Sequence, residues 1–407
     1  MKTIKKISTI TAAVTLAATL SGCTPSVGNN SVNAATIGGH DIPAGVFIYY
    51  TIQGINEASS LIEGQTGAAP DFDEIKSSNI DGIESTVWIQ NKALEYCTDY
   101  AGIVNEFEAI GGKLTREDID SANEMAEYYY SADPTLAKNG VSLDSMKAIA
   151  ESTYMEQAVF KHYYDFDGEK GCSEEELKKF FDENFARIKY VSISLKDQEG
   201  NKVSPTKERE LRKLADSYAE QVNKKSGELN KMHELDKVSE AYDEYVSAQT
   251  TTASGETAAA TTTTTTAAKS SETTTTDPYA NERLIQKYTT TTAAVQEEAA
   301  TTTTTAETDS DKNARLFNDY IFNELPYGKA EVYDFSEDTI YVVLRADLKE
   351  RMTEDDYWSE DYITNIQSIK YSEEFIKYLE EKTSTLTVEK NKSAFRRYEP
   401  FKLELTE

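Results

Sequence analysis

The sequence predicts a multi-domain α+β protein, in which a helical lobe is followed by a small antiparallel sheet-and-helix domain. Three observations lead to this prediction. Apolar residues recur at helical spacing through most of 36–184, residues 188–195 alternate with a period of two, and a threonine-rich block occupies 250–312. A two-residue period that follows directly on a charged helix indicates a chain that enters a sheet.

Residues 1–22 predict a secretion signal of the lipoprotein type. Three lysines precede the apolar run Ile7–Leu20, whose 14 residues are too few for a permanent membrane helix. The run ends in Leu-Ser-Gly-Cys, which matches the bacterial lipobox, and a diacylated Cys23 holds a protein on a membrane. The polar residues 23–35 favour a tether. We therefore expect a lipid anchor on the outer, extracytoplasmic face of the bacterial cell membrane.

The chain is strongly acidic. Its net charge of −29 becomes −32 once residues 1–22, which hold three lysines and no acids, are removed. Phosphate backbones need a basic partner, so this charge excludes nucleic acid as an expected partner. It favours a self-repelling surface and basic or unfolded polypeptide clients.

Two cysteines, Cys97 and Cys172, follow Cys23. We expect Cys97 in the core, because it shares one helical face with several apolar residues. These are Ile83, Val87, Leu94, Ala101 and Val104. An extracytoplasmic setting permits a Cys97–Cys172 disulfide, but we expect none.

The three histidines, His40, His162 and His233, are separated by about seventy residues or more. They form no histidine-based zinc motif, and the sequence has no Cys-x-x-Cys, P-loop or Gly-x-Ser-x-Gly pattern. We therefore expect neither a metal ion nor a cofactor.

The block 250–312 holds 24 threonines in 63 residues. Its few large apolar residues bury too little surface to offset the entropy of ordering, so we expect a disordered insertion. Within it, DPYANERLIQKY (277–288) is compatible with a transient helical turn.

Helices are expected in order along the first half of the chain. A short strand and a Gly-Gly turn lead into the first one. The others are expected near Ile83–Ile110, Thr115–Tyr130, Ser142–Tyr164 and Ser173–Asn184. Thr115 with Asp118, and Ser173 with Glu176, have the spacing of capping boxes.

Further elements follow the strand at 188–195. A helix at 206–222 places Leu211, Leu214 and Tyr218 on one face, and a second helix resumes after Gly227. Beyond the insertion we expect a helix, a turn and two strands. In the second of these strands Tyr341, Val343 and Arg345 alternate with Val342 and Leu344, and a last helix lies near Glu360–Glu381.

This order of elements resembles the extracytoplasmic foldases of the PrsA and SurA type, chaperones in which a SurA-N-like helical lobe surrounds a parvulin-type peptidyl-prolyl isomerase domain. Five stretches carry the resemblance, and they cover nearly all of the mature chain outside the threonine-rich block. They are IGGHDIPAGVF (37–47), NGVSLDSMKAIAESTYMEQAVFKHYYD (139–165), SEEELKKFFDENFARIKYVSISLKD (173–197), ADSYAEQVNKKSGELNKM (215–232) and LFNDYIFNELPYGKAEVYDFSEDTIYVVLRADL (316–348).

The resemblance implies a division of the mature chain. A tether, 23–35, leads into the helical N-terminal chaperone lobe, 36–184. A parvulin-like domain, 185–349, is interrupted by the insertion 250–312. The C-terminal helical segment, 350–407, is expected to pack on the N-terminal lobe.

The resemblance also identifies candidate site residues. Active parvulins carry one histidine in the first strand and one in the closing strand, and these form a hydrogen-bonded pair beneath the proline pocket. Ser192 and Tyr341 match these two positions, and Phe317 and Phe322 match apolar pocket positions. The family's Gly-Gly-x-Leu-Gly turn and pocket methionine are absent. We expect Ser192 and Tyr341 on neighbouring strands, on the same side of the sheet and able to hydrogen-bond.

Three functions remain open. The first is a membrane-anchored chaperone for secreted polypeptides, with weak or no isomerase activity, whose cradle draws on the 25 tyrosines. The second is an active parvulin-type isomerase, because isomerisation needs only a pocket that favours the twisted amide. The third is a surface scaffold lipoprotein that kept the fold.

Overall fold

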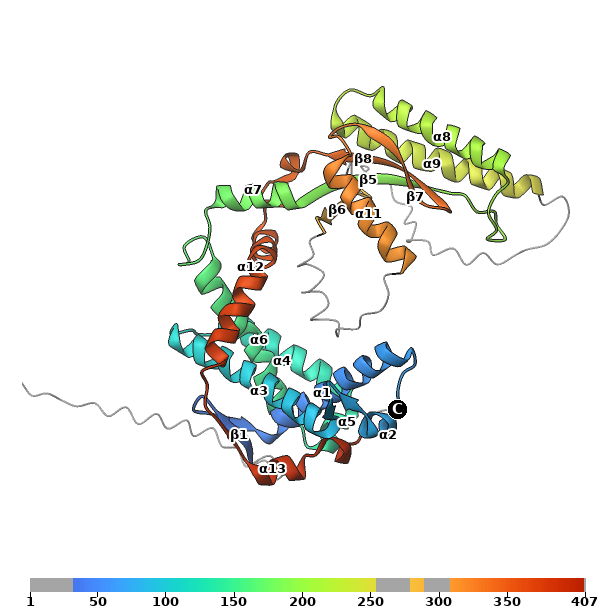
Figure 1. Ribbon diagram of the computed structural model, residues 1–407. Helices are drawn as coiled ribbons and strands as arrows, with labels where there is room; N and C mark the ends of the chain where they lie inside the picture. Colours follow the sequence, from blue (N-terminus) through green and yellow to red (C-terminus); the bar gives the residue numbers. More distant parts are fainter. Residues whose placement is uncertain (1–31, 254–278, 289–307, 406–407) are drawn as a thin grey trace, which may run out of the picture.

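The structure is a computed structural model that describes residues 32–253, 279–288 and 308–405. The predicted signal, the lipidation site Cys23 and the threonine runs within 254–278 and 289–307 lie outside the described residues. Figure 1 shows a helical lobe and a sheet domain, joined through α7 and α12. Among the described residues, no helix is long and apolar enough to cross a membrane.

The lobe is built from helices whose ends the sequence marks. They are α1 (Ala44–Thr66), α2 (Phe72–Ser77), α3 (Ser85–Ala109), α4 (Arg116–Ala132), α5 (Pro134–Asn139), α6 (Leu143–Tyr164) and α7 (Glu174–Asn184). The predicted capping boxes of Thr115 with Asp118 and of Ser173 with Glu176 open α4 and α7. Each box pairs backbone N–H groups that a helix start leaves without an intrahelical acceptor. The predicted helices α3, α4, α6 and α7 are therefore confirmed, with ends within two residues.

Short strands from both ends of the chain meet in the lobe. β1 (Asn33–Ile37) turns at Gly38-Gly39, where both residues have positive φ, and pairs with β2 (His40–Pro43). Its other edge pairs with β9 (Val388–Lys390), so the sheet order is β2-β1-β9. Residues 33–35, which were expected in the tether, belong to β1. These residues form a strand and not a tether because Ala34 and Ala35 are buried in the core.

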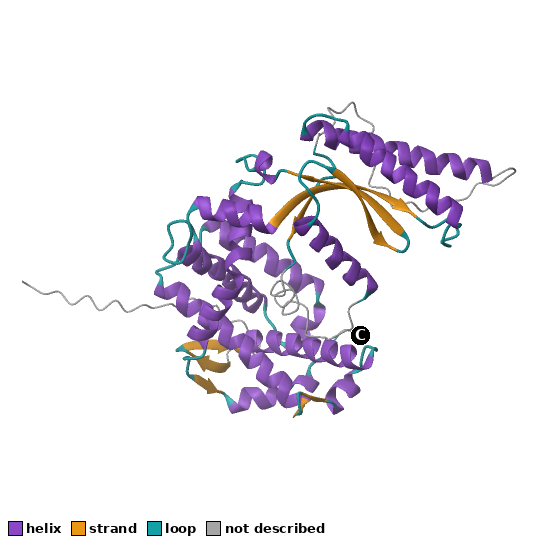
Figure 2. Cartoon of the chain, turned by 45° about the horizontal axis from the view of Figure 1, so that its top comes forward, coloured by secondary structure: helices purple, strands orange, loops and turns teal. Residues whose placement is uncertain are grey.

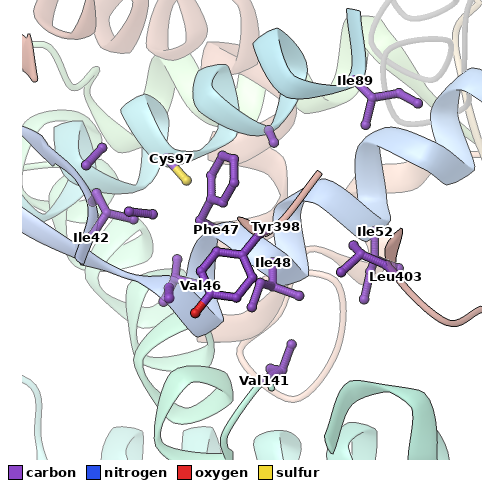
Figure 3. Packing of buried hydrophobic residues seen from close by; sticks show 14 of the residues in the cluster. Ile42, Val46, Phe47, Ile48, Ile52, Ile89, Cys97, Val141, Tyr398 and Leu403 are labelled. Carbon is purple, nitrogen blue, oxygen red and sulfur yellow. The ribbon is translucent and has the colours of Figure 1, made fainter. Parts of the chain in front are cut away.

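The C-terminal segment completes the same lobe. It consists of α12 (Glu360–Thr383), β9, α13 (Lys392–Arg397) and the short 3-10 turn η2 (Pro400–Lys402). Tyr398 and Leu403 share one hydrophobic cluster with Phe47 and Ile48 of α1, and Cys97 of α3 lies there too, as Figure 3 shows. In Figure 1 the red end of the chain lies beside blue β1. The lobe core therefore needs both ends of the sequence.

The sheet domain has one antiparallel sheet in the order β6-β5-β8-β7. Its strands are β5 (Phe185–Ser194), β6 (Arg283–Gln286), β7 (Ala330–Ser336) and β8 (Thr339–Ala346). The helices α8 (Pro205–Asn223) and α9 (Glu228–Ala253) cover one face, and α11 (Asp309–Asn323) crosses the other (Figure 2). The 3-10 turn η1 (Leu348–Arg351) and a short loop lead from β8 to α12. Small antiparallel sheets beside helices establish a mixed α and β architecture.

Alternation along β5 and β8 decides which residues meet which helices. Val191 and Ile193 of β5 pack with Ile340 and Val342 of β8 against α8 and α9. The helix α8 contributes Leu211, Leu214 and Tyr218, the face that the sequence predicts. On the other face, Ile188 and Val343 pack with Ile321 of α11.

The prediction of a disordered insertion is wrong for 279–288. Arg283–Gln286 form β6, which pairs with the first half of β5. Leu284 and Ile285 pack into two different hydrophobic clusters. The helix α9 also continues to Ala253, and Thr308 caps α11. The composition of the whole block did not indicate this short apolar run. A four-residue strand is stable only when it pairs with another strand, here the edge of β5.

The environment of Cys97 is as expected, but the predicted helical face is wrong. Cys97 is fully buried, whereas Ile83 and Val87 are 40% and 44% exposed. Ile83 belongs to the hairpin of β3 (Asn79–Ile80) and β4 (Ile83–Glu84), before α3 begins, so it does not follow the helical period. The buried line of α3 runs instead through Ile89, Ala93, Cys97 and Ala101. Cys97 and Cys172 are both free thiols.

Candidate functional site

Ser192 and Tyr341 lie directly opposite each other in the β5–β8 ladder. Directly opposed residues point to the same side of a sheet, so the expected neighbour relation is confirmed. Their side is that of α11, because Ser192 has the same parity as Ile188 and Tyr190. Ser192 is exposed and Tyr341 is half-buried.

Tyr341 stands in a cluster of rings that we call the aromatic face. Its members are Tyr190, Phe317, Tyr333, Phe335 and Tyr341. The ring centroid of Tyr341 lies 4.4 Å from that of Tyr190, 4.6 Å from Phe335 and 5.1 Å from Phe317. Offset and tilted rings at such distances attract one another. The result is an apolar surface on strands of a sheet, with Ser192 at its border.

The hydroxyl of Tyr341 is not paired with Ser192. No hydrogen bond joins these two described side chains, although the sequence suggested that they are able to form one. Burial raises the pKa of Tyr341 to about 12, and the charge and hydroxyl of Tyr190 add to this shift. The phenol therefore stays protonated at physiological pH and offers a neutral O–H donor.

The two pocket candidates on α11 occupy different places. Phe317 is buried, and its ring contacts Tyr190 at 6.1 Å and Tyr341 at 5.1 Å between centroids. Phe322, at the end of α11, lies beside charges instead, with Arg345 5.3 Å and Lys287 5.8 Å from its ring centroid. Both phenylalanines belong to the cluster that contains Tyr341, and among the described ring contacts Phe317, but not Phe322, meets Tyr341 directly.

The three histidines lie away from the aromatic face. His40 is in β2 of the lobe, where its Nε2 lies 3.1 Å from Oδ1 of Asn105. His162 belongs to the last turn of α6. His233 lies on α9, which covers the other face of the sheet. Within the described ranges, no group of three or more His, Cys, Asp and Glu residues is arranged to hold a metal ion.

The sequence did not predict a buried charge cluster at the start of β5. Arg187 is fully buried, and its Nε lies 3.1 Å from Oε2 of Glu282. Its Nη2 lies 3.1 Å from Oε1 of Glu228, the first residue of α9. Arg351 donates to the same Oε2 of Glu282 at 2.9 Å. This cluster ties β5 to α9, to the β6 segment and to the turn that leaves the sheet domain.

A second polar region lies in the lobe. A cavity of about 690 Å³ opens between α1, α3, α6 and α12. Its carboxylates are Glu57, Glu95, Asp99, Glu156 and Glu380. Lys92 is the cation facing them, and it pairs with Glu57 and Glu95 at 3.3 Å each. Glu95, Asp99 and Glu380 are exposed, so the cavity is open to solvent on their side.

The Asp99 side chain is exposed, but the neighbouring helices partly desolvate its carboxyl. Together with the Glu95 charge, this raises the pKa of Asp99 to about 6, against an opposing effect of Lys92. Burial also raises the pKa of Glu156. The folded state therefore binds these protons more tightly than the unfolded state does.

A pH-dependent stability follows from Asp99. A raised carboxyl pKa gives stability that is present at low pH and is lost as the pH rises from about 4 to about 6. Asp99→Asn should raise the Tm at pH 7 by on the order of 2 °C and change it little at pH 4. Thermal melts at both pH values check this, with exposed Asp216→Asn on α8 as control. An equal shift of the Tm at both pH values would contradict the effect.

The comparisons with known proteins find no family model and no curated protein that matches this chain.

Proposed function

We propose that the protein is a membrane-anchored extracytoplasmic chaperone of the PrsA and SurA foldase type, with weak or no prolyl isomerase activity. It binds unfolded segments of secreted polypeptides. The arrangement of the chain supports this proposal, because the sheet domain is inserted between α7 and α12 of a lobe that both chain ends complete. The division into lobe and inserted domain is the one that the resemblance implies.

The aromatic face is the observation that carries the proposal. Four of its rings lie on β5, β7 and β8 and are half-buried rather than covered, and the fifth, Phe317 of α11, is buried. Tyrosine rings present an apolar body with a hydroxyl that tolerates water, which suits transient contact with apolar segments of many sequences. The acidic surface adds attraction for basic clients, which salt weakens.

The same geometry disfavours efficient isomerisation. Catalysis of prolyl rotation needs a pocket that desolvates and polarises the twisted amide. Here an exposed serine and a phenol stand at the positions of the histidine pair, and buried Phe317 fills the space beside them. This arrangement offers a surface for side chains more readily than an enclosed proline site.

The test is suppression of aggregation. Phe335→Thr combined with Tyr341→Thr removes two rings but places β-branched threonines, which favour strands, at both positions. We expect the double variant to suppress aggregation of reduced, unfolded lysozyme several-fold less than the wild type. Light scattering during refolding measures this, for lysozyme and for at least two unrelated clients.

Two controls make the test specific. Tyr128→Thr removes a ring that is 68% exposed on α4 and should leave suppression unchanged. Ser192→Ala with Tyr341→Phe keeps the rings and should retain client binding. Undiminished suppression by the Phe335–Tyr341 variant would contradict the chaperone surface. Strong, Ser192-dependent isomerase turnover of a proline peptide would favour the isomerase, and binding of one partner alone would favour the scaffold.

A further inference from the structure

The strand β5 has one edge that is paired along most of its length and one that is paired only in part. β8 pairs with Arg187–Ser194 on the first edge. On the second edge β6 pairs with Phe185–Ile188, the end of β5 next to α7 in Figure 1. Among the described strands, none continues along this second edge beside Tyr190 and Ser192. We call this part the open edge of β5.

The ladder register shows which backbone groups face the open edge. The N–H of Leu195 donates to the carbonyl of Asp338 at 2.8 Å, next to the last β5–β8 pair. Hydrogen-bonded pairs alternate in an antiparallel ladder, so the odd-numbered residues of β5 bond to β8 and the even-numbered residues face the other side. The N–H and C=O groups of Tyr190 and Ser192 therefore point to the open edge.

Two hydrogen bonds support this assignment. The N–H of Ser194 donates to the hydroxyl of Tyr242 on α9 at 2.9 Å. The carbonyl of Asn184 accepts from the N–H of Lys287, directly after β6, at 2.7 Å. Both bonds use even-numbered residues on the side away from β8. Between them, the described chain supplies no backbone partner for the two even-numbered residues of the open edge.

The chain before β6 turns away from this edge. Asn281 adopts a positive φ of 64°, and the N–H of Glu282 donates back to the carbonyl of Tyr279 at 3.2 Å. The guanidinium of Arg351 lies 4.1 Å from the centroid of the Tyr279 ring. A tight turn therefore ends β6 opposite Ile188, and within the described ranges the length of β5 beyond it has no strand beside it.

The open edge borders the aromatic face. Tyr190 belongs to that face, and Ser192 is exposed at its border. Directly opposed residues of two strands point to the same side of a sheet, so a strand added here directs every second side chain onto the rings. Unpaired N–H and C=O groups of an edge are a template for a further strand, and peptides are recognised in this way by backbone pairing and alternate side chains.

The charge of the chain favours a client over a second copy as the added strand. With a net charge of −29, two copies repel each other, whereas a basic or neutral segment meets no such barrier. Pairing through backbone groups also depends little on side chains, which suits clients of many sequences.

We propose that the open edge binds an extended segment of a client polypeptide as an added antiparallel strand, with an apolar residue at every second position. The N–H groups of these apolar residues donate to the carbonyls of Tyr190 and Ser192, and their side chains lie on the aromatic face. This inference rests on the proposed function, since the client is the ligand, and it adds how the backbone of the client is held.

Ser192→Pro tests the open edge on the protein. Proline removes the N–H that faces the edge, and strands tolerate proline where the N–H points away from the ladder. Ser192→Ala is the matched comparison, because it also removes the hydroxyl but keeps the N–H. Fluorescence anisotropy of labelled acetyl-Lys-Val-Thr-Phe-Thr-Val-Lys-amide measures binding. We expect saturable binding to the wild type, and binding about tenfold weaker in Ser192→Pro than in Ser192→Ala.

N-methylated peptides test the same edge on the ligand. They are measured with the wild-type protein, so they decide the question whether or not Ser192→Pro folds, which circular dichroism shows. Methylation of the phenylalanine nitrogen removes an N–H that the added strand donates to β5, and it should weaken binding by about tenfold. Methylation of the next threonine nitrogen removes an N–H that points away from β5, and it should change the affinity by less than about twofold.

Four results would overturn the added strand. The first three are no saturable binding of the unmethylated peptide, equal binding by folded Ser192→Pro and Ser192→Ala, and an effect of threonine methylation as large as that of phenylalanine methylation. The fourth is a dimer of the protein alone that Ser192→Pro disrupts, seen by size-exclusion chromatography, which would make a second copy the occupant. Loss of aggregation suppression in the Phe335–Tyr341 variant together with any of these results removes the added strand and leaves the proposed function standing.

Discussion

Glu282→Ala should lower the free energy of unfolding of the sheet domain by about 3 kcal/mol, the lower end of the range for breaking a buried ion pair. Arg187 is fully buried, and Glu282 is its partner from the β6 segment. Without that carboxylate the buried guanidinium keeps, among the described residues, the carboxylates of Glu228 and half-exposed Glu350 and the backbone carbonyl of Asp347. Arg351 loses the same partner. Urea unfolding, followed by circular dichroism, measures the change.

The pKa of Glu282 qualifies what this cluster contributes. Burial raises the pKa of Glu282, and the charges of Arg187 and Arg351 offset that rise only in part. The desolvation of the pair therefore costs more free energy than its attraction supplies. Removing the Glu282 carboxylate lowers stability mainly because it leaves the buried charge of Arg187 uncompensated. Glu282→Gln keeps a carbonyl acceptor and should cost less than Glu282→Ala.

A matched control is available on α8. Glu220 is exposed, and Glu220→Ala should stay within about 0.5 kcal/mol of the wild type. A loss below about 1 kcal/mol for Glu282→Ala would mean that β6 is not a structural part of the sheet domain. Deleting 250–312 should lower the melting temperature for the same reason, because the deletion removes β6.

Phe47→Ala should destabilise the helical lobe by about 3–5 kcal/mol, as large-to-small changes of buried phenylalanines do. Phe47 is fully buried, and its ring centroid lies 4.5 Å from that of Phe395 of α13. Figure 3 shows its side chain among those of Ile48, Cys97 and Tyr398, from both ends of the chain. The cavity left behind cannot close without moving α1 against the C-terminal segment.

Denaturant unfolding of the lobe measures this loss, with Tyr128→Ala as an exposed aromatic control that should change little. A double-mutant cycle with Phe395→Ala isolates the contact between the chain ends. A coupling near zero, with a small effect of Phe47→Ala alone, would mean that the C-terminal segment does not complete the core.

Local signals predicted most of the fold. The capping boxes of α4 and α7, and the alternation along β5 and β8, depend on residues close in sequence, so they could be read directly. The Ser192–Tyr341 pairing followed from that alternation and from the resemblance. What sequence could not supply was the partner of each polar residue within an element.

Arg187 and Gln367 illustrate this limit. The alternation along β5 predicts only which face of the sheet Arg187 lies on. Its partners Glu228 and Glu282 are distant in sequence, so no local pattern predicts these ion pairs. Gln367 looks like an ordinary polar residue of a surface helix, and only the packing of α6 against α12 buries it. Likewise β6 depends on the edge of β5, more than ninety residues earlier, which no local pattern encodes.

The pairing of β1 with β9 has a consequence for the order of folding. Ala35 pairs with Lys390, so one edge of the first described strand, opposite β2, stays unpaired until nearly the whole chain is available. The contacts of the sheet domain lie between these two strands in sequence, and domains usually fold as units. Closing so long a loop is slow. During N-to-C synthesis the sheet domain should therefore form first, while one edge of β1 stays unpaired and exposed to proteases until the C-terminal segment is made.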